Sequence, residues 1–159
     1  MRDMPEIGDR APDFALYDYD RKVRQMSEFL VKGHRTIVAF FPGAFTGVCT
    51  QEMCAFRDMY GELQNMSGVL VGISVDAPFA QKGFAEKHNL TFPLLCDFKR
   101  QTIQDYGVVW KNLGGVEGYV CANRAIFVVD DAGKILFKWV AENPGTLPDF
   151  DGVKKALRA

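Results

Sequence analysis

The chain has little of several features that define whole classes of protein. Only 4 of its 159 residues are cysteine, too few to hold a small fold together by disulfides. Its 19 basic and 20 acidic side chains nearly balance, so a net charge of -1 gives no long-range attraction to nucleic acid or anionic lipid. We therefore expect neither nucleic acid nor a membrane among its partners.

Long hydrophobic runs are also missing. The most apolar window, residues 37–41 (IVAFF), ends at Pro42, whereas a membrane-spanning helix needs about 20 such residues. Residues 1–14 are charged and lack the apolar core of a secretory signal. These features favour a cytoplasmic protein. In a reducing compartment, closely spaced cysteines indicate catalysis or metal binding more often than structural cross-links.

Hydrophobic periodicity predicts alternating strands and helices. Uninterrupted apolar runs predict buried strands over residues 36–41 and 68–74. Between them a helical period starts at Cys49 and predicts a helix with one buried face. The apolar residues of that face are Met53, Phe56, Tyr60 and Leu63. No repeat or linker interrupts the sequence, so we expect a single domain over residues 1–159.

Weaker signals predict the other elements. Strands are expected over residues 11–18, 92–96, 124–129 and 134–140, and helical segments at Ser27, at Asp76 with Pro78 (carrying Phe79, Phe84 and Ala85), over residues 102–106, and around Val153 and Leu157. Residues 130–133 (DDAG) predict an antiparallel hairpin between the last two strands. The order predicts an α/β fold with a central mixed β-sheet flanked by helices. A right-handed crossover then places Cys49 at the carboxyl end of a central strand, where such sheets carry their chemistry.

Cys49 is the first candidate for that chemistry. A thiol reacts as its thiolate, and the unpaired N–H groups and positive dipole end of a helix N-terminus favour this anion and lower the pKa. The preceding loop supplies the Thr46 hydroxyl, with Pro42, Phe45 and Val48 as the apolar lining of a pocket. The same spacing is also typical of a small buried core cysteine, so it leaves both interpretations open.

Cys54 follows in the same predicted helix. Ideal helix geometry separates Cα atoms five residues apart by roughly 8.7 Å, whereas a disulfide needs about 7 Å or less. If both cysteines react, the first turns of the helix must unwind in each cycle. The alternative is that Cys54 is a half-buried helix residue with no chemical role.

Several segments together carry a family resemblance. They are residues 11–14 (APDF), 38–58 (VAFFPGAFTGVCTQEMCAFRD), 72–76 (GISVD) and 123–130 (NRAIFVVD). The spacing of Pro42, Thr46 and Cys49, with a downstream arginine that opens a strand, is highly specific and resembles the peroxiredoxins of the AhpC/TSA superfamily. The Cys-x4-Cys pair resembles the peroxiredoxin Q (bacterioferritin comigratory protein) type, and the loop FTG with residues 72–92 resembles the alkyl hydroperoxidase E type.

The resemblance implies a thioredoxin-like fold with an N-terminal extension and a thiol-dependent peroxidase activity on hydrogen peroxide and organic hydroperoxides. Cys49 is implied as the peroxidatic thiolate, with Arg124 lowering its pKa and stabilising charge on the peroxide. Thr46 is implied to hold thiolate or peroxide, Pro42 to shield the pocket, and Glu52 to orient its surroundings. By position alone, an arginine before a strand is usually a surface charge and a loop threonine usually stabilises a turn.

Cys54 is implied as the resolving cysteine, which forms an intramolecular disulfide that a thioredoxin- or glutaredoxin-like protein reduces. Cys121 is an alternative resolver because it lies three residues before Arg124, and Cys96 is interpreted as core. Resolution by an external thiol is a further alternative. The resemblance implies no metal or organic cofactor. Monomer and homodimer both stay open, as does the preferred peroxide.

Two other classes of protein fit parts of the sequence. A thiol–disulfide oxidoreductase shares the expected fold but usually carries Cys-x-x-Cys, and here four residues intervene. A metal or iron–sulfur binding module could use the cysteines with His34 and His88. None of these is paired at Cys-x2-Cys spacing, however, and His88 lies in a polar helix segment.

Overall fold

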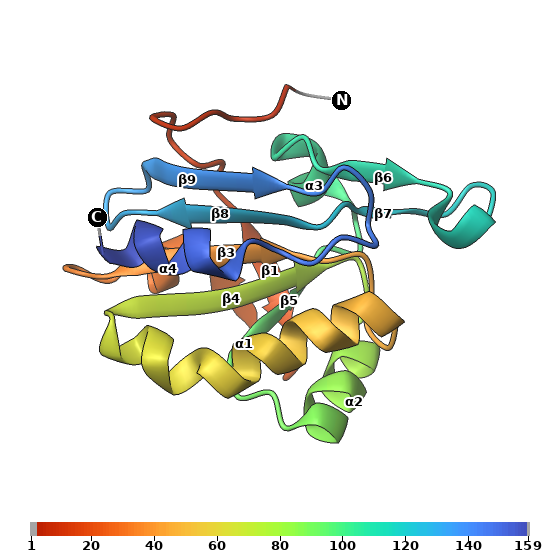
Figure 1. The fold of residues 1–159 in the computed structure, drawn as a ribbon. Coiled ribbons are helices and arrows are strands. Elements are labelled where there is room, and N and C mark those ends of the chain that lie inside the picture. The colour runs from red at the N-terminus through yellow and green to blue at the C-terminus, as the bar shows by residue number, and fades with distance from the viewer. Residues whose placement is uncertain (1–2, 159) are drawn as a thin grey trace.

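The computed structural model describes residues 3–158, so residues 1, 2 and 159 of the predicted domain lie outside the described part. Seven strands form one sheet in the order β2-β1-β5-β4-β3-β8-β9, and β6 pairs with β7 in a second sheet (Figure 1). The strands are β1 Ala15–Asp18, β2 Val23–Gln25, β3 Arg35–Phe40, β4 Gly68–Ser74, β5 Leu94–Cys96, β6 Val109–Lys111, β7 Val120–Ala122, β8 Ala125–Val129 and β9 Ile135–Val140.

The helices cover both faces of this sheet. They are the short 3₁₀ segments η1 Met26–Phe29 and η2 Leu113–Gly115 and the α-helices α1 Gly47–Asn65, α2 Pro78–His88, α3 Gln101–Asp105 and α4 Phe150–Arg158. In Figure 1, α1 and α4 lie in front of the sheet. No helix within residues 3–158 has the length and apolar character needed to cross a membrane.

The sheet is mixed, as the sequence predicts. β3 pairs parallel with β4, with Val38 opposite Val71, and the two strands are joined through α1. β4 in turn pairs parallel with β5. On its other edge β3 pairs antiparallel with β8, and β8 with β9, which confirms the predicted hairpin. The combination is a thioredoxin-like fold in which β4 is the middle strand of the seven and β3 lies next to it.

Alternation along β3 divides the core into two layers. Ile37 and Ala39 belong to the layer under α1, α2 and α4, and Val38 and Phe40 to the layer under η1, α3 and the β6–β7 hairpin. All four side chains are at most 1% exposed. A strand covered on both faces explains why this segment is apolar without a polar alternation.

The N-terminal extension lies along the start of β9. The Ala11 N–H donates to the Gly133 carbonyl at 2.8 Å, and the Ile135 N–H donates to the Asp9 carbonyl at 2.9 Å. From α3's side of the molecule, the Tyr106 hydroxyl donates to the Pro12 carbonyl at 2.7 Å. These bonds hold residues 11–14 (APDF) against the core layer that contains Val38 and Phe40.

The helix predicted from Cys49 begins two residues earlier, at Gly47. On its predicted buried face, Met53, Phe56 and Leu63 are fully buried. Tyr60 is half-buried, and its ring packs edge-on against Phe92 with centroids 5.7 Å apart.

Other local predictions need correction. Ser27 does not cap η1, because Gln25 occupies the cap position and its N–H bonds to the Glu28 carboxylate at 2.6 Å. Asp76 does not open α2: the cap is Ala77, and the Asp76 side chain is used elsewhere. α2 carries Phe79, Phe84 and Ala85 as predicted; Phe84 and Ala85 are buried, whereas Phe79 is 72% exposed. Strands β2, β6 and β7 were not predicted; each has three residues, too few to show a period.

Candidate active site

The turn between β3 and α1 positions Cys49. β3 ends at Phe40, Thr46 caps the helix in an extended conformation, and Cys49 is the third residue of α1. The Thr46 carbonyl accepts from both the N–H and the hydroxyl of Thr50, at 2.9 and 2.8 Å. The cysteine is therefore within the first turn, as predicted, and its side chain is 0% exposed.

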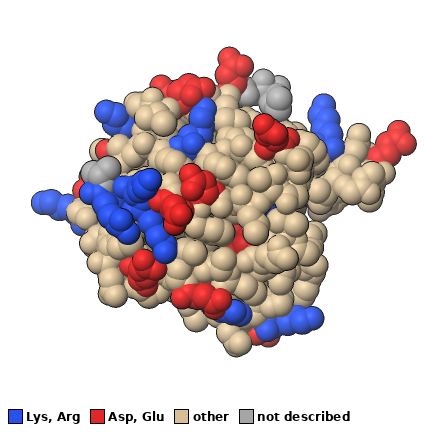
Figure 2. Space-filling view, viewed as in Figure 1, with Lys and Arg blue, Asp and Glu red and all other residues tan. Residues whose placement is uncertain are grey.

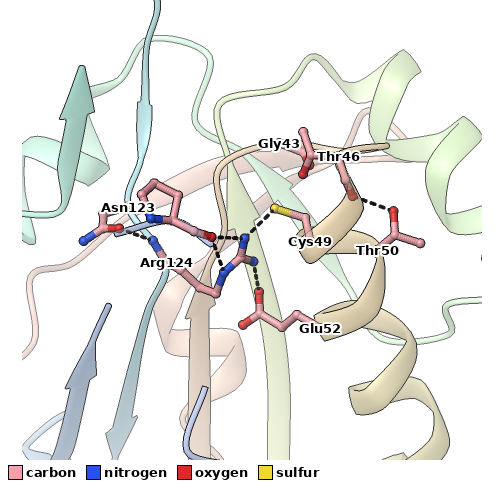
Figure 3. A network of polar contacts seen from close by, with 8 residues as sticks. Gly43, Thr46, Cys49, Thr50, Glu52, Asn123 and Arg124 are labelled. Atoms are coloured by element: carbon pink, nitrogen blue, oxygen red, sulfur yellow. Dashed lines mark hydrogen bonds and ion pairs between the residues drawn. The ribbon is translucent and has the colours of Figure 1, made fainter. Parts of the chain in front are cut away.

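Arg124 reaches this sulfur from the start of β8. Its Nη2 donates to Cys49 Sγ at 3.2 Å and its Nη1 to Glu52 Oε1 at 2.6 Å (Figure 3). The remaining donors, Nε and again Nη2, bond to the Pro144 carbonyl at 3.1 and 2.7 Å. Arg124 is 1% exposed and is the largest of the fully buried side chains among residues 3–158. Its guanidinium is therefore a fixed positive charge beside the sulfur.

The backbone before β8 is also fixed by hydrogen bonds. The Asn123 side chain accepts from the Arg124 N–H at 2.9 Å and donates to the Ala141 carbonyl at 2.8 Å. Neither Asn123 nor the Pro144 carbonyl was predicted. A backbone acceptor 20 residues along the chain has no sequence signature, whereas an amide next to the arginine is a signal that could have been used.

Glu52 forms a buried ion pair with Arg124. Its carboxylate is 0% exposed, and Oε2 has no hydrogen-bond partner within the described residues. Burial raises the pKa of Glu52 to about 7, against the opposing effect of Arg124. Burial also acts to lower the pKa of Arg124, but Glu52 and Cys49 raise it by more. One guanidinium is thus shared between a thiol and a carboxyl that titrates near neutrality.

The pKa of Cys49 is raised in the closed pocket, whereas the sequence predicts that it is lowered. Burial raises the pKa of the thiol, and it outweighs the Arg124 charge, the Thr46 hydroxyl and the Gly43 backbone, which all lower it. The physical reason is that a fully covered sulfur loses the hydration that stabilises its anion. The direction predicted from the helix start and the arginine alone is therefore wrong for this conformation.

Thr46 has a divided role in the structure. Its hydroxyl donates to the Gly43 carbonyl at 2.9 Å and also lies within hydrogen-bonding reach of the Cys49 thiol. A hydroxyl has a single proton to donate. It can therefore donate to the thiolate, or to a peroxide oxygen, only by giving up the bond to Gly43.

A cavity of about 370 Å³ opens beside these groups. Its lining residues are Pro42, Thr46, Gly47, Val48, Leu113, Gly114, Arg124, Pro144 and Gly145. Pro42 and Val48 line it as predicted, but Phe45 does not. The Phe45 ring is 53% exposed and packs against Phe84 with centroids 5.3 Å apart, from a backbone at φ +67°.

Asp76 anchors the loop that carries Thr46. Its Oδ2 accepts from the Ala44 N–H at 2.8 Å and from the Ser74 hydroxyl at 2.6 Å. The Ser74 oxygen in turn accepts from the buried Gln81 amide at 2.7 Å. This function of Asp76 was missed, although its place directly after a parallel strand is the signal that could have indicated it.

The other three cysteines are also free thiols. Cys54 is half-buried and lies five positions beyond Cys49 on an unbroken α1, so the structure does not join the pair. Cys96 and Cys121 are buried, and burial raises their pKa values to about 12 and about 11. Among residues 3–158, no three His, Cys, Asp or Glu side chains are grouped so that they could hold a metal ion.

Comparison with known proteins identifies the family. Residues 7–138 match the AhpC/TSA family. The chain belongs to this family and is a peroxiredoxin. It is 33% identical to peroxiredoxin Bcp of Bacillus subtilis over 156 residues, which cover 91% of this chain and 96% of that protein. It is 37% identical to peroxiredoxin Bcp of Escherichia coli K12 over 130 residues, or 82% of each.

A solved structure agrees with this assignment. The crystal structure of peroxidoxin BcpB from Mycobacterium tuberculosis is similar to this peroxiredoxin with a TM-score of 0.85 and 32% identity, over 98% of this chain and 97% of that one. The resemblance to the bacterioferritin comigratory protein type is therefore confirmed. Membership supports a thiol peroxidase, which takes a peroxide as substrate and a thiol as reductant.

Proposed function

We propose that this peroxiredoxin reduces hydrogen peroxide and organic hydroperoxides through Cys49, with Cys54 as the resolving cysteine. The observation that carries the proposal is the contact of 3.2 Å between Arg124 Nη2 and Cys49 Sγ at the start of α1. A buried guanidinium stabilises both the thiolate and the negative charge that develops on peroxide oxygen. Thr46 and Pro42 complete the pocket, one as a donor and the other as apolar cover.

The first half-reaction oxidises the sulfur. The Cys49 thiolate attacks one oxygen of the peroxide, an S–O bond forms and the O–O bond breaks. The second oxygen leaves with the electron pair and takes up a proton to give water or an alcohol, and Cys49 becomes a sulfenic acid. In this proposal Arg124 stabilises the charge on the leaving oxygen.

The second half-reaction needs a change of conformation. α1 is continuous from Gly47 to Asn65, and regular helix geometry holds the two Cα atoms roughly 8.7 Å apart. A disulfide needs about 7 Å or less, so the first turns must unwind before Cys54 can attack the sulfenic sulfur and release water. A thioredoxin- or glutaredoxin-like dithiol then reduces the disulfide by exchange.

Treatment with one equivalent of hydrogen peroxide, followed by disulfide mapping by mass spectrometry, tests the assignment. We expect a Cys49–Cys54 link in the wild type and a sulfenic acid at Cys49 in Cys54→Ser. Cys121→Ser is the matched control, because it removes the alternative resolver and should leave the link intact.

Normal cycling of Cys54→Ser with a thioredoxin-type reductant would show that Cys54 is not required. A Cys49–Cys121 link in that variant would assign the role to Cys121. A sulfenic acid reduced directly by added small thiols would assign resolution to an external thiol.

A further inference from the structure

Arg57 is the basic residue nearest in sequence to the proposed resolving cysteine. It lies three positions beyond Cys54 on α1, and side chains three residues apart are neighbours on the surface of a helix. We propose that Arg57 is a positioning residue for the resolving step, because its guanidinium keeps a positive charge beside the Cys54 sulfur while the first turns of α1 open. The inference rests on the proposed function and adds to it a residue that acts in the second half-reaction only.

Cys54 has to lose its proton before it can attack. The thiolate is the nucleophile that forms the new S–S bond, and the S–O bond of the Cys49 sulfenic acid breaks as hydroxide leaves. The hydroxide takes up the proton that Cys54 released, so the product is water. A cation beside Cys54 favours the thiolate over the thiol and therefore increases the fraction of molecules that can react.

Two hydrogen bonds hold the guanidinium of Arg57 in place. Its Nη1 donates to the carbonyl of His88, the last residue of α2, at 2.8 Å, and its Nε donates to Asp58 Oδ1 at 3.0 Å. The carboxyl end of a helix favours a cation, because its last carbonyls carry partial negative charge. The position of this guanidinium therefore depends on α2 and not on the turn of α1 that carries Cys49.

α1 is also anchored directly after Cys54. Phe56 is fully buried, and its ring packs edge-on against Phe150 of α4 with centroids 5.2 Å apart. Together with the bond from Arg57 to α2, this contact ties two consecutive residues of α1 to two different helices. We therefore expect the opening of α1 to stop before Phe56, so that Cys54 is released while Arg57 stays beside it.

The charges of these neighbours interact in the closed state. The hydrogen bond to Asp58 raises the pKa of Arg57, and the charge of Cys54 acts in the same direction, whereas burial opposes both. Because such an interaction is mutual, the guanidinium also favours the Cys54 thiolate. The basic groups in the last turn of α2, Lys87 and His88, add charge of the same sign. Neither is changed in the variants below, so neither affects the comparison between them.

This part of the surface is open to solvent. In Figure 2, side chains of both charges lie along the lower edge of the face shown, where Figure 1 shows α1 and α2. The side chain of Arg57 is 34% exposed and that of Asp58 69% exposed. Salt screens charges in such positions, with a Debye length of about 3 Å at about 1 M. The effect of Arg57 on Cys54 should therefore weaken as the ionic strength rises, whereas a purely structural contact has no such dependence.

The expected change in rate follows from thiol chemistry. A single opposite charge beside a thiol changes its ionised fraction by about tenfold. The more basic thiolate of Arg57→Gln is a better nucleophile, and a Brønsted coefficient of about 0.5 offsets roughly threefold of that loss. We therefore expect Arg57→Gln to lower the first-order rate constant of resolution about threefold at pH 7. Where the thiol is fully ionised, the variant should be as fast as the wild type or faster, so the two pH profiles converge or cross.

Rapid quenching after one equivalent of hydrogen peroxide, followed by mass spectrometry of the intact chain, tests the inference. The amounts of thiol, sulfenic acid and disulfide against time give separate rate constants for attack and for resolution. Arg57→Gln should slow resolution and spare peroxide attack. The difference between Arg57→Gln and the wild type should shrink at about 1 M potassium chloride.

Three further variants sharpen this test. Arg57→Lys keeps a positive charge and should restore most of the resolving rate. Asp58→Asn removes the carboxylate that shares the guanidinium and should speed resolution by up to about twofold at pH 7. Arg35→Gln is the matched control, because Arg35 Nη1 also donates to a helix carbonyl, that of Ala156 in α4. Arg35 lies at the start of β3, whereas Cys49 follows its end, so this variant should resolve at the wild-type rate.

Two results would overturn the inference alone. One is a Cys49–Cys54 link that forms at the same rate in the wild type and in Arg57→Gln at every pH. The other is an equal slowing of attack and resolution at every pH without rescue by Arg57→Lys, which would make Arg57 a structural residue. A wild type that forms no Cys49–Cys54 link would refute the proposed function, and the inference with it.

Discussion

Replacing Glu52 with glutamine tests how the buried charges at the site are coupled. Arg124 Nη1 donates to the Glu52 carboxylate at 2.6 Å, and Arg124 Nη2 donates to the Cys49 sulfur at 3.2 Å. An ionised Glu52 therefore competes with the thiolate for a single positive charge. In Glu52→Gln the side chain keeps its shape and an acceptor oxygen but carries no charge, so Arg124 acts on the sulfur alone.

The spacing of Cys49 and Glu52 on α1 sets the size of the expected shift in the Cys49 pKa. Cys49 and Glu52 are three residues apart on α1, so their side chains are neighbours at about 6 Å. Two unit charges at that distance and an effective dielectric constant of 20 repel by roughly 3 kcal/mol, or about two pKa units. We expect Glu52→Gln to lower the pKa of Cys49 by up to about two units at a pH above 7, where wild-type Glu52 is ionised.

The same variant changes stability with a defined sign. Burial raises the pKa of Glu52 from its ordinary value of 4.5 to about 7, so folding favours the protonated carboxyl. Its contribution to stability is fully present below pH 4.5 and is lost as the pH rises through 7, by roughly 3 kcal/mol in total. Glu52→Gln should therefore match the wild type below pH 4.5 and be more stable than it at pH 8.

Two measurements check these expectations. Peptide-resolved alkylation with iodoacetamide from pH 5 to pH 9 gives the titration of Cys49 separately from that of Cys54. Urea unfolding across the same range gives the free energy of unfolding. Glu62→Gln is the control, because it removes a carboxylate from the same helix that is 52% exposed and pairs with Lys154. Superimposable alkylation profiles for Glu52→Gln and the wild type would refute the shared-guanidinium reasoning.

Two further predictions concern the groups that hold the site. Arg124→Lys keeps the charge but loses the planar fork that reaches the sulfur, Glu52 and a backbone carbonyl together, so the rate of peroxide attack should fall about a hundredfold or more by stopped-flow kinetics. Asp76→Ala leaves the Ala44 N–H and the Ser74 hydroxyl without their acceptor. It should lower the free energy of unfolding by about 1–3 kcal/mol and slow peroxide attack, whereas Asp76→Asn should restore part of both; equal rates in all three proteins would contradict the role of the anchor.

Much of the fold could be predicted because its central elements are buried on both faces. β3 and β4 are continuous apolar runs, and the period of α1 shows which side faces the sheet. The β6–β7 hairpin could not be predicted in this way. Its strands have three residues each, and its shape depends on positive φ angles at Asn112, Gly114 and Gly118 rather than on a hydrophobic pattern.

The residues of the candidate active site also differ in how far the sequence alone could predict them. Thr46 could be placed near Cys49 from its position in the loop before the helix, whereas Glu52 was assigned only through the family pattern. The contact of Arg124 with the sulfur joins residues 75 positions apart and was assigned only through the family pattern. The direction of the Cys49 pKa could not be obtained from either source, because it depends on how completely the surrounding layers cover the sulfur.

The two proposed half-reactions place opposite demands on the first turns of α1. In the proposed cycle, peroxide attack needs Cys49 beside Arg124, whereas disulfide formation needs those turns to open. We expect an opening that includes Glu52, three residues beyond Cys49, to separate its carboxylate from Arg124. Opening allows Glu52 to ionise in water, so a rise in pH through 7 favours the open state by the same linkage that lowers stability. In the proposed cycle we therefore expect Glu52 to couple the protonation of the pocket to the balance between oxidation of Cys49 and its resolution.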